Sequence, residues 1–238
     1  MTTHAVTSSL NNSLGTKLLP GVLSIIAGSV DVISFLGLGG LFAAHITGNL
    51  VVLAAHLVTG RVASLASILS VPVFVAVLGV TRLAAAGLEQ TGRRPLQPLL
   101  AAQLALLVSV LALWVRAGPH LDPAAPITVV AGMLGVASMA VQNALERLLV
   151  GAPATAVMTT DITSFVMDIG AMLFRHDHDG VAYARSRAGR TLPAIVGFTF
   201  GCSLGAVLEV MIGPWSLALP TGFALVALAL GPSSNPSR

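Results

Sequence analysis

The chain has 238 residues, of which 55% are hydrophobic and only 9% are Asp, Glu, Lys or Arg. Soluble domains carry about 25% charged residues, so this composition excludes an ordinary water-soluble domain. The net charge of +3 comes from basic residues that are scattered between apolar runs, which is not the pattern of a nucleic-acid-binding protein. We therefore predict an integral membrane protein whose hydrophobic helices have the lipid bilayer as their partner.

Eight apolar segments follow a polar N-terminal tail, 1–16, which lacks the pattern of a signal peptide. Each segment is close to the ~20 residues that span a hydrocarbon core. Short Gly-rich links join the first two segments and the last two, so either pair could include a re-entrant helix. The segments run over residues 18–38, 41–59, 65–88, 96–115, 124–145, 152–174, 191–212 and 214–231.

The predicted fold class is therefore an all-α polytopic transmembrane helix bundle with six to eight membrane segments. It forms one domain, 17–231, followed by a C-terminal tail, 232–238. The longest polar stretch, 175–190, separates the sixth and seventh segments. The chain has a single cysteine, Cys202, so no intramolecular disulfide is possible.

The basic residues predict a cytoplasmic N-terminus in the cell membrane. If all eight segments span, eight basic residues lie on the cytoplasmic side and four lie outside or near the outer boundary. The pair Arg93 and Arg94 conflicts with this arrangement because it falls outside. A re-entrant early segment would place the pair inside.

The two halves of the chain resemble each other at an offset of 112 residues, which indicates an internal duplication with repeats 17–117 and 124–231. The stretch 45–49 matches 157–161, and Asp31 falls on Asn143. Transporters are often built from such repeats, with the binding site between them near the bilayer midplane. The alternative is chance recurrence of the small residues common in membrane helices. The sequence leaves parallel and inverted repeats both open.

Asp31 lies in the middle of the first apolar segment, where a carboxylate costs ~2.5–3.5 kcal/mol on insertion scales. We predict that it faces the bundle or a wet cavity, either as a proton or cation site or as a structural hydrogen-bond partner. His45, Thr47, Gly48 and Asn49 interrupt the second segment with polar groups, and Gly48 permits a helix break or a close backbone approach. They predict a small polar site, and the alternative is packing between helices.

The second half contains a matching set of polar residues inside or beside apolar segments. Their positions in the repeat add them to the predicted substrate or ion site. They are Gln142, Asn143, Thr159, Thr160 and Asp161. Glu146 and Arg147 are interpreted as marking a membrane boundary, and Asp168 shares a helix face with Asp161.

No enzyme signature is present, so no catalytic residue, cofactor or metal site is predicted. The stretch 175–179 alternates His and Asp in a way that could bind Zn²⁺ or Ni²⁺ weakly. A solvated loop is the favoured interpretation, because four ligands in a row cannot easily surround one metal ion.

Ala27-Gly28-x-x-Asp31, then Phe42 and His45-x-Thr47-Gly48-Asn49, resembles the YoaK-like family of small bacterial membrane proteins, a domain-of-unknown-function family. The resemblance covers roughly residues 15–231 and implies a multi-span architecture without an established substrate. In the second half, Thr160-Asp161 replaces the Thr-Gly-type step of that pattern.

Two functions are expected from these residues. The first is a small transporter or permease for an unknown small solute, in which Asp31 or Asp161 carries a coupling proton or cation. The second is a non-transporting membrane scaffold or partner subunit, in which the polar residues hold helices together. Homo-oligomerisation is compatible with both.

Overall fold

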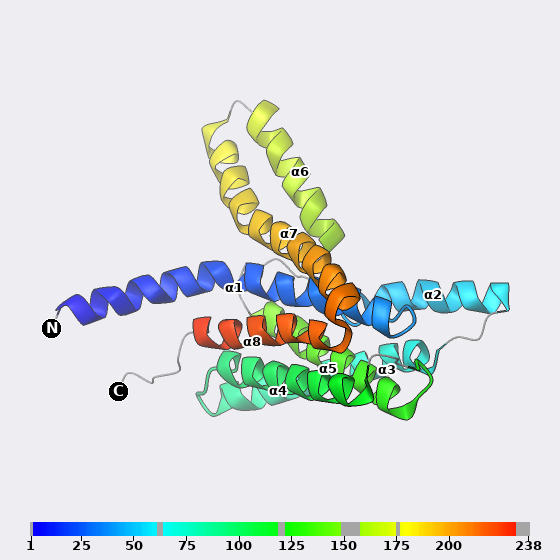
Figure 1. Cartoon of the computed structure of the whole chain (residues 1–238). Helices are drawn as coiled ribbons and strands as arrows, with labels where there is room; N and C mark the ends of the chain where they lie inside the picture. The colour runs from blue at the N-terminus through cyan, green and yellow to red at the C-terminus, as the bar shows by residue number, and fades with distance from the viewer. Residues whose placement is uncertain (1, 61–63, 119–121, 149–157, 175–176, 232–238) are drawn as a thin grey trace.

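The computed structural model describes residues 2–60, 64–118, 122–148, 158–174 and 177–231, with side chains from Leu18 onward. Over these residues the chain forms helices joined by short links, without strands (Figure 1). The elements in chain order are α1 (Thr2–Gly37), α2 (Ile46–Thr59), α3 (Leu65–Gln90), α4 (Leu96–Ala117), α5 (Pro126–Leu148), α6 (Met158–Phe174), α7 (His178–Ile212), the 3-10 helix η2 (Gly213–Leu217) and α8 (Ala218–Leu230). The predicted all-α class is confirmed.

Five helical stretches among the described residues are long and apolar enough to cross a bilayer. The last of them joins α7, η2 and α8 into one run, whereas α2 has only 14 residues and is shorter than a span. A polytopic membrane helix bundle is therefore confirmed. The stretches are Leu18–Gly37, Leu65–Gln90, Leu96–Ala117, Pro126–Leu148 and His178–Leu230.

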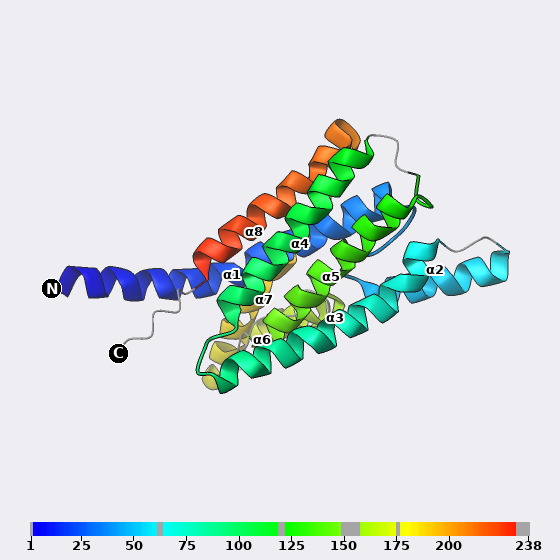
Figure 2. The ribbon, with the colours of Figure 1, turned by 90° about the horizontal axis from the view of Figure 1, so that it is seen from below.

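Six helices form the bundle, and their directions follow from their contacts. Helix α5 runs against α1, because Gln142 near the end of α5 bonds the carbonyl of Leu23 near the start of the apolar part of α1. Helix α8 runs against α4, because Gln97 at the start of α4 bonds the carbonyl of Gly231. Figures 1 and 2 show α3 also running against α1, and the second half of α7 running along it.

The α1–α7 contact is the closest in the bundle and depends on glycine. A Cβ at Gly197 would lie 2.5 Å from the carbonyl oxygen of Gly21, and one at Gly205 would lie 3.1 Å from the Cα of Ser29. Small residues spaced by four along a helix allow two backbones to approach in this way. This contact brings the middle of α7 beside Asp31.

Helices α2 and α6 lie outside the bundle. Each packs chiefly against the helix that follows it, α2 on α3 and α6 on α7. Figure 1 shows α6 and the first half of α7 standing away from the other helices, and α2 extends beyond the bundle in Figures 1 and 2. The exposed side chains of α2 are mostly apolar, with Val51 at 70% and Leu57 at 76% exposure, as expected for a surface that faces lipid.

The polar N-terminal tail is helical from Thr2. One predicted boundary is wrong: the helix of the seventh segment, 191–212, starts earlier, because α7 begins at His178 within the polar stretch 175–190. The Asp177 carboxylate accepts hydrogen bonds from the backbone N–H groups of Asp179 and Gly180, and this cap starts the helix within the polar stretch. Asp177 therefore serves as a helix cap, while Arg175 and His176 lie outside the described residues.

Candidate functional site

The link between α1 and α2 is fastened to a carboxylate in the middle of α1. Gly39 and Gly40 turn the chain with φ values of 66° and 91°, a conformation open to glycine. The chain then returns so that Asp31 Oδ1 accepts hydrogen bonds from the backbone N–H of Ala44, at 2.6 Å, and of His45, at 3.3 Å. Both residues lie just before α2, with His45 as its N-cap residue, so the Asp31 carboxylate lies at the positive end of α2 and accepts the unpaired N–H of the N-cap.

The other carboxylate oxygen of Asp31 pairs with the His45 ring. Oδ2 meets Nδ1 of His45 in a very short hydrogen bond. The Asp31 side chain is 6% exposed and the His45 side chain is 28% exposed. Phe198 of α7 meets the His45 ring edge to face, with centroids 5.3 Å apart. The imidazole is therefore the part of the pair that is accessible from outside the bundle.

Asn49 holds the same link at a second point. Its Oδ1 accepts from the Phe42 N–H at 2.8 Å, and its Nδ2 donates to the Phe42 carbonyl at 2.7 Å. A Cβ at Gly48 would lie 2.9 Å from the Phe42 ring, so Gly48 makes room for that ring. Of the two roles predicted for Gly48, the structure shows the close approach and not the break: Gly48 lies in the first turn of α2, and the helix is interrupted by the link before Ile46.

Gln142 belongs to a buried network at the other end of α1. It donates to the Leu23 carbonyl at 2.9 Å and to Glu146 Oε1 at 3.0 Å, and its own carbonyl oxygen accepts from Gln103 Nε2 at 2.6 Å. Glu146 is 4% exposed and belongs to this network near the end of α5, so its interpretation as a boundary residue stays a prediction. The neighbouring Asn143 donates to the Met139 carbonyl of its own helix at 3.2 Å.

The remaining predicted residues lie at the surface. Thr47 on α2 and Thr159 and Thr160 on α6 are exposed. Asp161, on the first turn of α6, is half-buried, and its Oδ2 has no hydrogen-bond partner among the described residues. Burial raises the pKa of Asp161 to about 6.

The structure therefore brings together part of the predicted site. Asp31, His45 and Asn49 meet around the α1–α2 link, whereas no hydrogen bond between described residues joins them to Gln142 or Asp161. Gln103 was missed, although an amide in the middle of an apolar segment is the signal that identifies Gln142. The hydrogen bond from the Ala44 backbone N–H to Asp31 could not be predicted, because a backbone group is the same in every residue and leaves no signal in the sequence.

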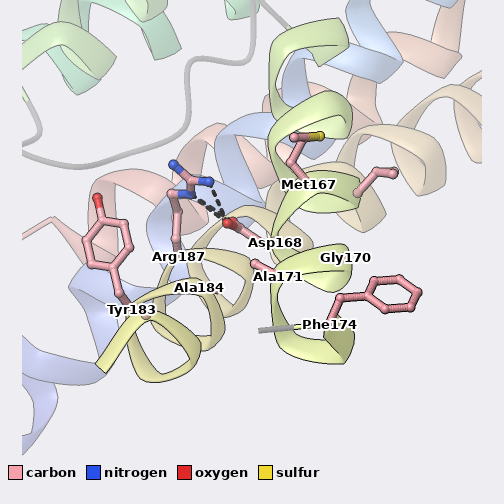
Figure 3. Close-up of a pocket in the computed structure, with 10 residues that line it drawn as sticks. Met167, Asp168, Gly170, Ala171, Phe174, Tyr183, Ala184 and Arg187 are labelled. Carbon is pink, nitrogen blue, oxygen red and sulfur yellow. Dashed lines mark hydrogen bonds and ion pairs between the residues drawn. The ribbon is translucent and has the colours of Figure 1, made fainter. Parts of the chain in front are cut away.

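A groove of about 710 Å³ lies between α6 and the first half of α7 (Figure 3). Arg187 Nε donates to Asp168 Oδ2 at 2.8 Å, and Nη2 donates to Oδ1 at 2.5 Å. These are the two charged residues of the lining, and they pair with each other. The other lining residues are mostly apolar, so we place the candidate site at Asp31 and not in this groove. Asp168 is buried.

The chain matches the family described as "Protein of unknown function (DUF1275)" over residues 19–230. The chain therefore belongs to the DUF1275 family. No curated protein and no solved structure matches it. This membership is consistent with the resemblance to the YoaK-like family found in the sequence, which is also a domain-of-unknown-function family.

Proposed function

We propose that this DUF1275 member is a small secondary transporter of the cell membrane, of the YoaK-like type, with its ion site at Asp31 and His45. The observation that carries the proposal is a carboxylate buried in a membrane helix and paired with the imidazole that begins a broken helix. Ionisable residues at membrane depth mark ion and substrate pathways. Broken helices occur where backbone lines such a site.

An inverted repeat, which the helix contacts favour, is the second argument for this proposal. If α1–α4 are exchanged with α5–α8, the packed pairs among these eight helices are again packed pairs. The α1–α7 contact becomes α3–α5, α4–α5 becomes α1–α8, and α2–α3 becomes α6–α7, while α4–α8 and α1–α5 map onto themselves. Within the bundle, corresponding helices run in opposite directions (Figures 1 and 2). Four segments per repeat can be inverted only if one of them does not cross, and α2 and α6 are the helices outside the bundle.

Six crossing helices also account for the charges. Lys17, Arg93, Arg94 and Arg147 are then at the bundle end where α1 enters, together with the arginines of the first half of α7. Arg116, in the last turn of α4, is at the opposite end. The positive-inside rule makes the first end cytoplasmic, so the N-terminus is inside and the conflict at Arg93 and Arg94 disappears. Cysteine labelling tests this: Arg94→Cys is accessible from the cytoplasm and Asp122→Cys from outside, whereas eight spans give the reverse.

A second candidate function, a membrane scaffold, is favoured by a different observation. Asn49 is 1% exposed, and both the oxygen and the nitrogen of its side-chain amide form hydrogen bonds with the Phe42 backbone. Gln142 forms hydrogen bonds with three partners in the core. Such polar groups stabilise contacts between helices without any ligand. On this alternative, Asp31→Asn and Asn49→Ala reduce folded yield and no solute has an effect.

The test of transport has two stages. Purified protein is first screened by thermal shift against a panel of small solutes, because a bound solute stabilises the native state. Proteoliposomes are then loaded with a pH-sensitive dye, and proton uptake is measured when the stabilising solute is added. We expect the proton flux of Asp31→Asn to be at least about tenfold lower than that of the wild type. The matched control is Glu89→Gln, which removes an exposed carboxylate from α3. Wild-type flux in Asp31→Asn would refute the role of Asp31.

A further inference from the structure

The groups that contact Asp31 indicate which kind of ion the proposed transporter uses. Among the described residues, the Asp31 carboxylate contacts the Ala44 N–H, the His45 N–H and the His45 ring nitrogen. Hard metal cations take several oxygen ligands in proteins, whereas nitrogen groups contact both oxygens here. A proton needs only one lone pair, and the Asp31 Oδ2 and His45 Nδ1 atoms are paired so that they can hold one between them.

The same carboxylate fastens the start of α2 to α1. Ionised, Asp31 accepts two backbone hydrogen bonds with the strength of a charge-assisted acceptor and attracts the positive end of the helix. Protonated, it loses its charge and commits one oxygen to its own proton. The two amides and the ring are then released together. The second fastening, from Asn49 to Phe42, uses an amide that does not titrate.

We infer that the coupling ion is a proton, and that its arrival at the Asp31–His45 pair releases the α1–α2 link at Ala44 and His45 while Asn49 keeps Phe42 in place. This inference rests on the proposed function and names its ion and its coupling step. The exposed edge of His45 is the entry for the proton, because Asp31 itself is shielded.

Few other titratable groups face Asp31 from the helices around it. On α7, the Cys202 thiol donates to the Gly28 carbonyl at 3.4 Å, close to one turn before Asp31, and Glu209 lies against Gly37 further along. On α5, Glu146 belongs to the network at Leu23. Helix α8 carries no titratable side chain. The pH response of the link therefore comes from Asp31 and His45.

Hydrogen–deuterium exchange at single-residue resolution tests the inference on the full chain in lipid nanodiscs. After correction for the intrinsic rate, we expect protection of the Ala44 and His45 amides to fall at least about tenfold between pH 7.5 and pH 4.5. The Phe42 amide serves as the internal control and stays protected, because Asn49 holds it. Asp31→Asn should show the low protection at both pH values, and Glu89→Gln should behave like the wild type.

Two results overturn the inference. One is protection of Ala44 and His45 that does not change with pH and survives in Asp31→Asn. The other is loss of protection at Phe42 together with the other two amides, which indicates unfolding of the whole link. Flux that depends on Asp31 with unchanged exchange refutes this coupling step and leaves transport standing. A pH-dependent release without flux for any solute refutes transport and leaves the release standing.

Discussion

The close contact of α1 and α7 makes Gly201→Ala the most informative stability test. A Cβ at Gly201 would overlap the Ile25 carbonyl oxygen and lie 3.0 Å from both the carbonyl carbon and the Cα of Ile25. These are backbone atoms, so they cannot rotate aside as the end of a long side chain does. The two helices must separate, and the neighbouring contacts at Gly197 and Gly205 lose their fit as well.

We expect Gly201→Ala to cost about 2–3 kcal/mol, the upper range for overpacking a core. For a chain of this size, that is a fall in the unfolding temperature of about 4–12 °C. The assay is thermal unfolding in detergent or nanodiscs. The matched control is Gly189→Ala on the same helix, where no atom lies within 4 Å of the added Cβ. Alanine there should stabilise by about 0.5–1 kcal/mol, since it is the better helix former.

Comparing Gly201→Ala with Gly189→Ala separates the steric effect of a methyl group in a close contact from the effect of replacing glycine with a better helix former. If Gly201→Ala and Gly189→Ala change the unfolding temperature equally, or if Gly201→Ala leaves it within about 1 °C of the wild type, the close backbone contact is refuted. A fall confined to Gly201→Ala assigns the loss to the α1–α7 contact, because both substitutions add the same methyl group to one helix.

Three further comparisons test polar groups by thermal unfolding. Asn49→Ala leaves the N–H and carbonyl of Phe42 unpaired and should cost about 2–3 kcal/mol; an unchanged unfolding temperature would contradict the two bonds. Arg187→Gln leaves the buried Asp168 carboxylate unpaired, so it should lower the unfolding temperature more than Asp168→Asn does, and the reverse order would refute the burial of Asp168. Asp161→Asn should stabilise at pH 7.5 by about 1 kcal/mol, after allowance for the exposed half of Asp161. Because burial raises the pKa of Asp161 to about 6, the folded state holds its proton more tightly than the unfolded state, so the carboxyl weakens the fold as pH rises from about 4 through 6. The gain from Asp161→Asn should therefore vanish at pH 4, and a gain that is equal at both pH values would contradict this cause.

The sequence predicts most of the helices because apolar runs of membrane length are a strong local signal. The segments predicted at 65–88 and 96–115 differ from α3 and α4 by at most two residues at each end. It also predicts that Asp31 is protected from lipid, since an exposed carboxylate in the middle of a membrane helix would be too costly. His45 and Asn49 are found by the same reasoning, as polar groups in an apolar run.

What the sequence misses depends on contacts between distant residues. The burial of Glu146 depends on the approach of Gln142 to α1, which no local pattern records. The start of α7 depends on the cap at Asp177, which outweighs the polarity of the residues after it. Whether the proposed repeats are parallel or inverted depends on whether α2 crosses, and a 14-residue apolar helix does not reveal this in the sequence.

The choice of side chain at position 31 bears on transport and scaffold alike. A scaffold requires only that helices be held together by hydrogen bonds, and an amide makes such bonds without a charge, as Asn49 does for Phe42, although more weakly than a carboxylate does. At the position 112 residues after Asp31, the chain has an amide, Asn143. A carboxylate at Asp31 carries the larger desolvation cost of ~2.5–3.5 kcal/mol on insertion scales. An acid pairs with His45 and exchanges a proton with it, and an amide cannot. The cost is therefore best explained by proton chemistry at this position, and Asp31→Asn isolates it because the amide preserves shape and one acceptor oxygen.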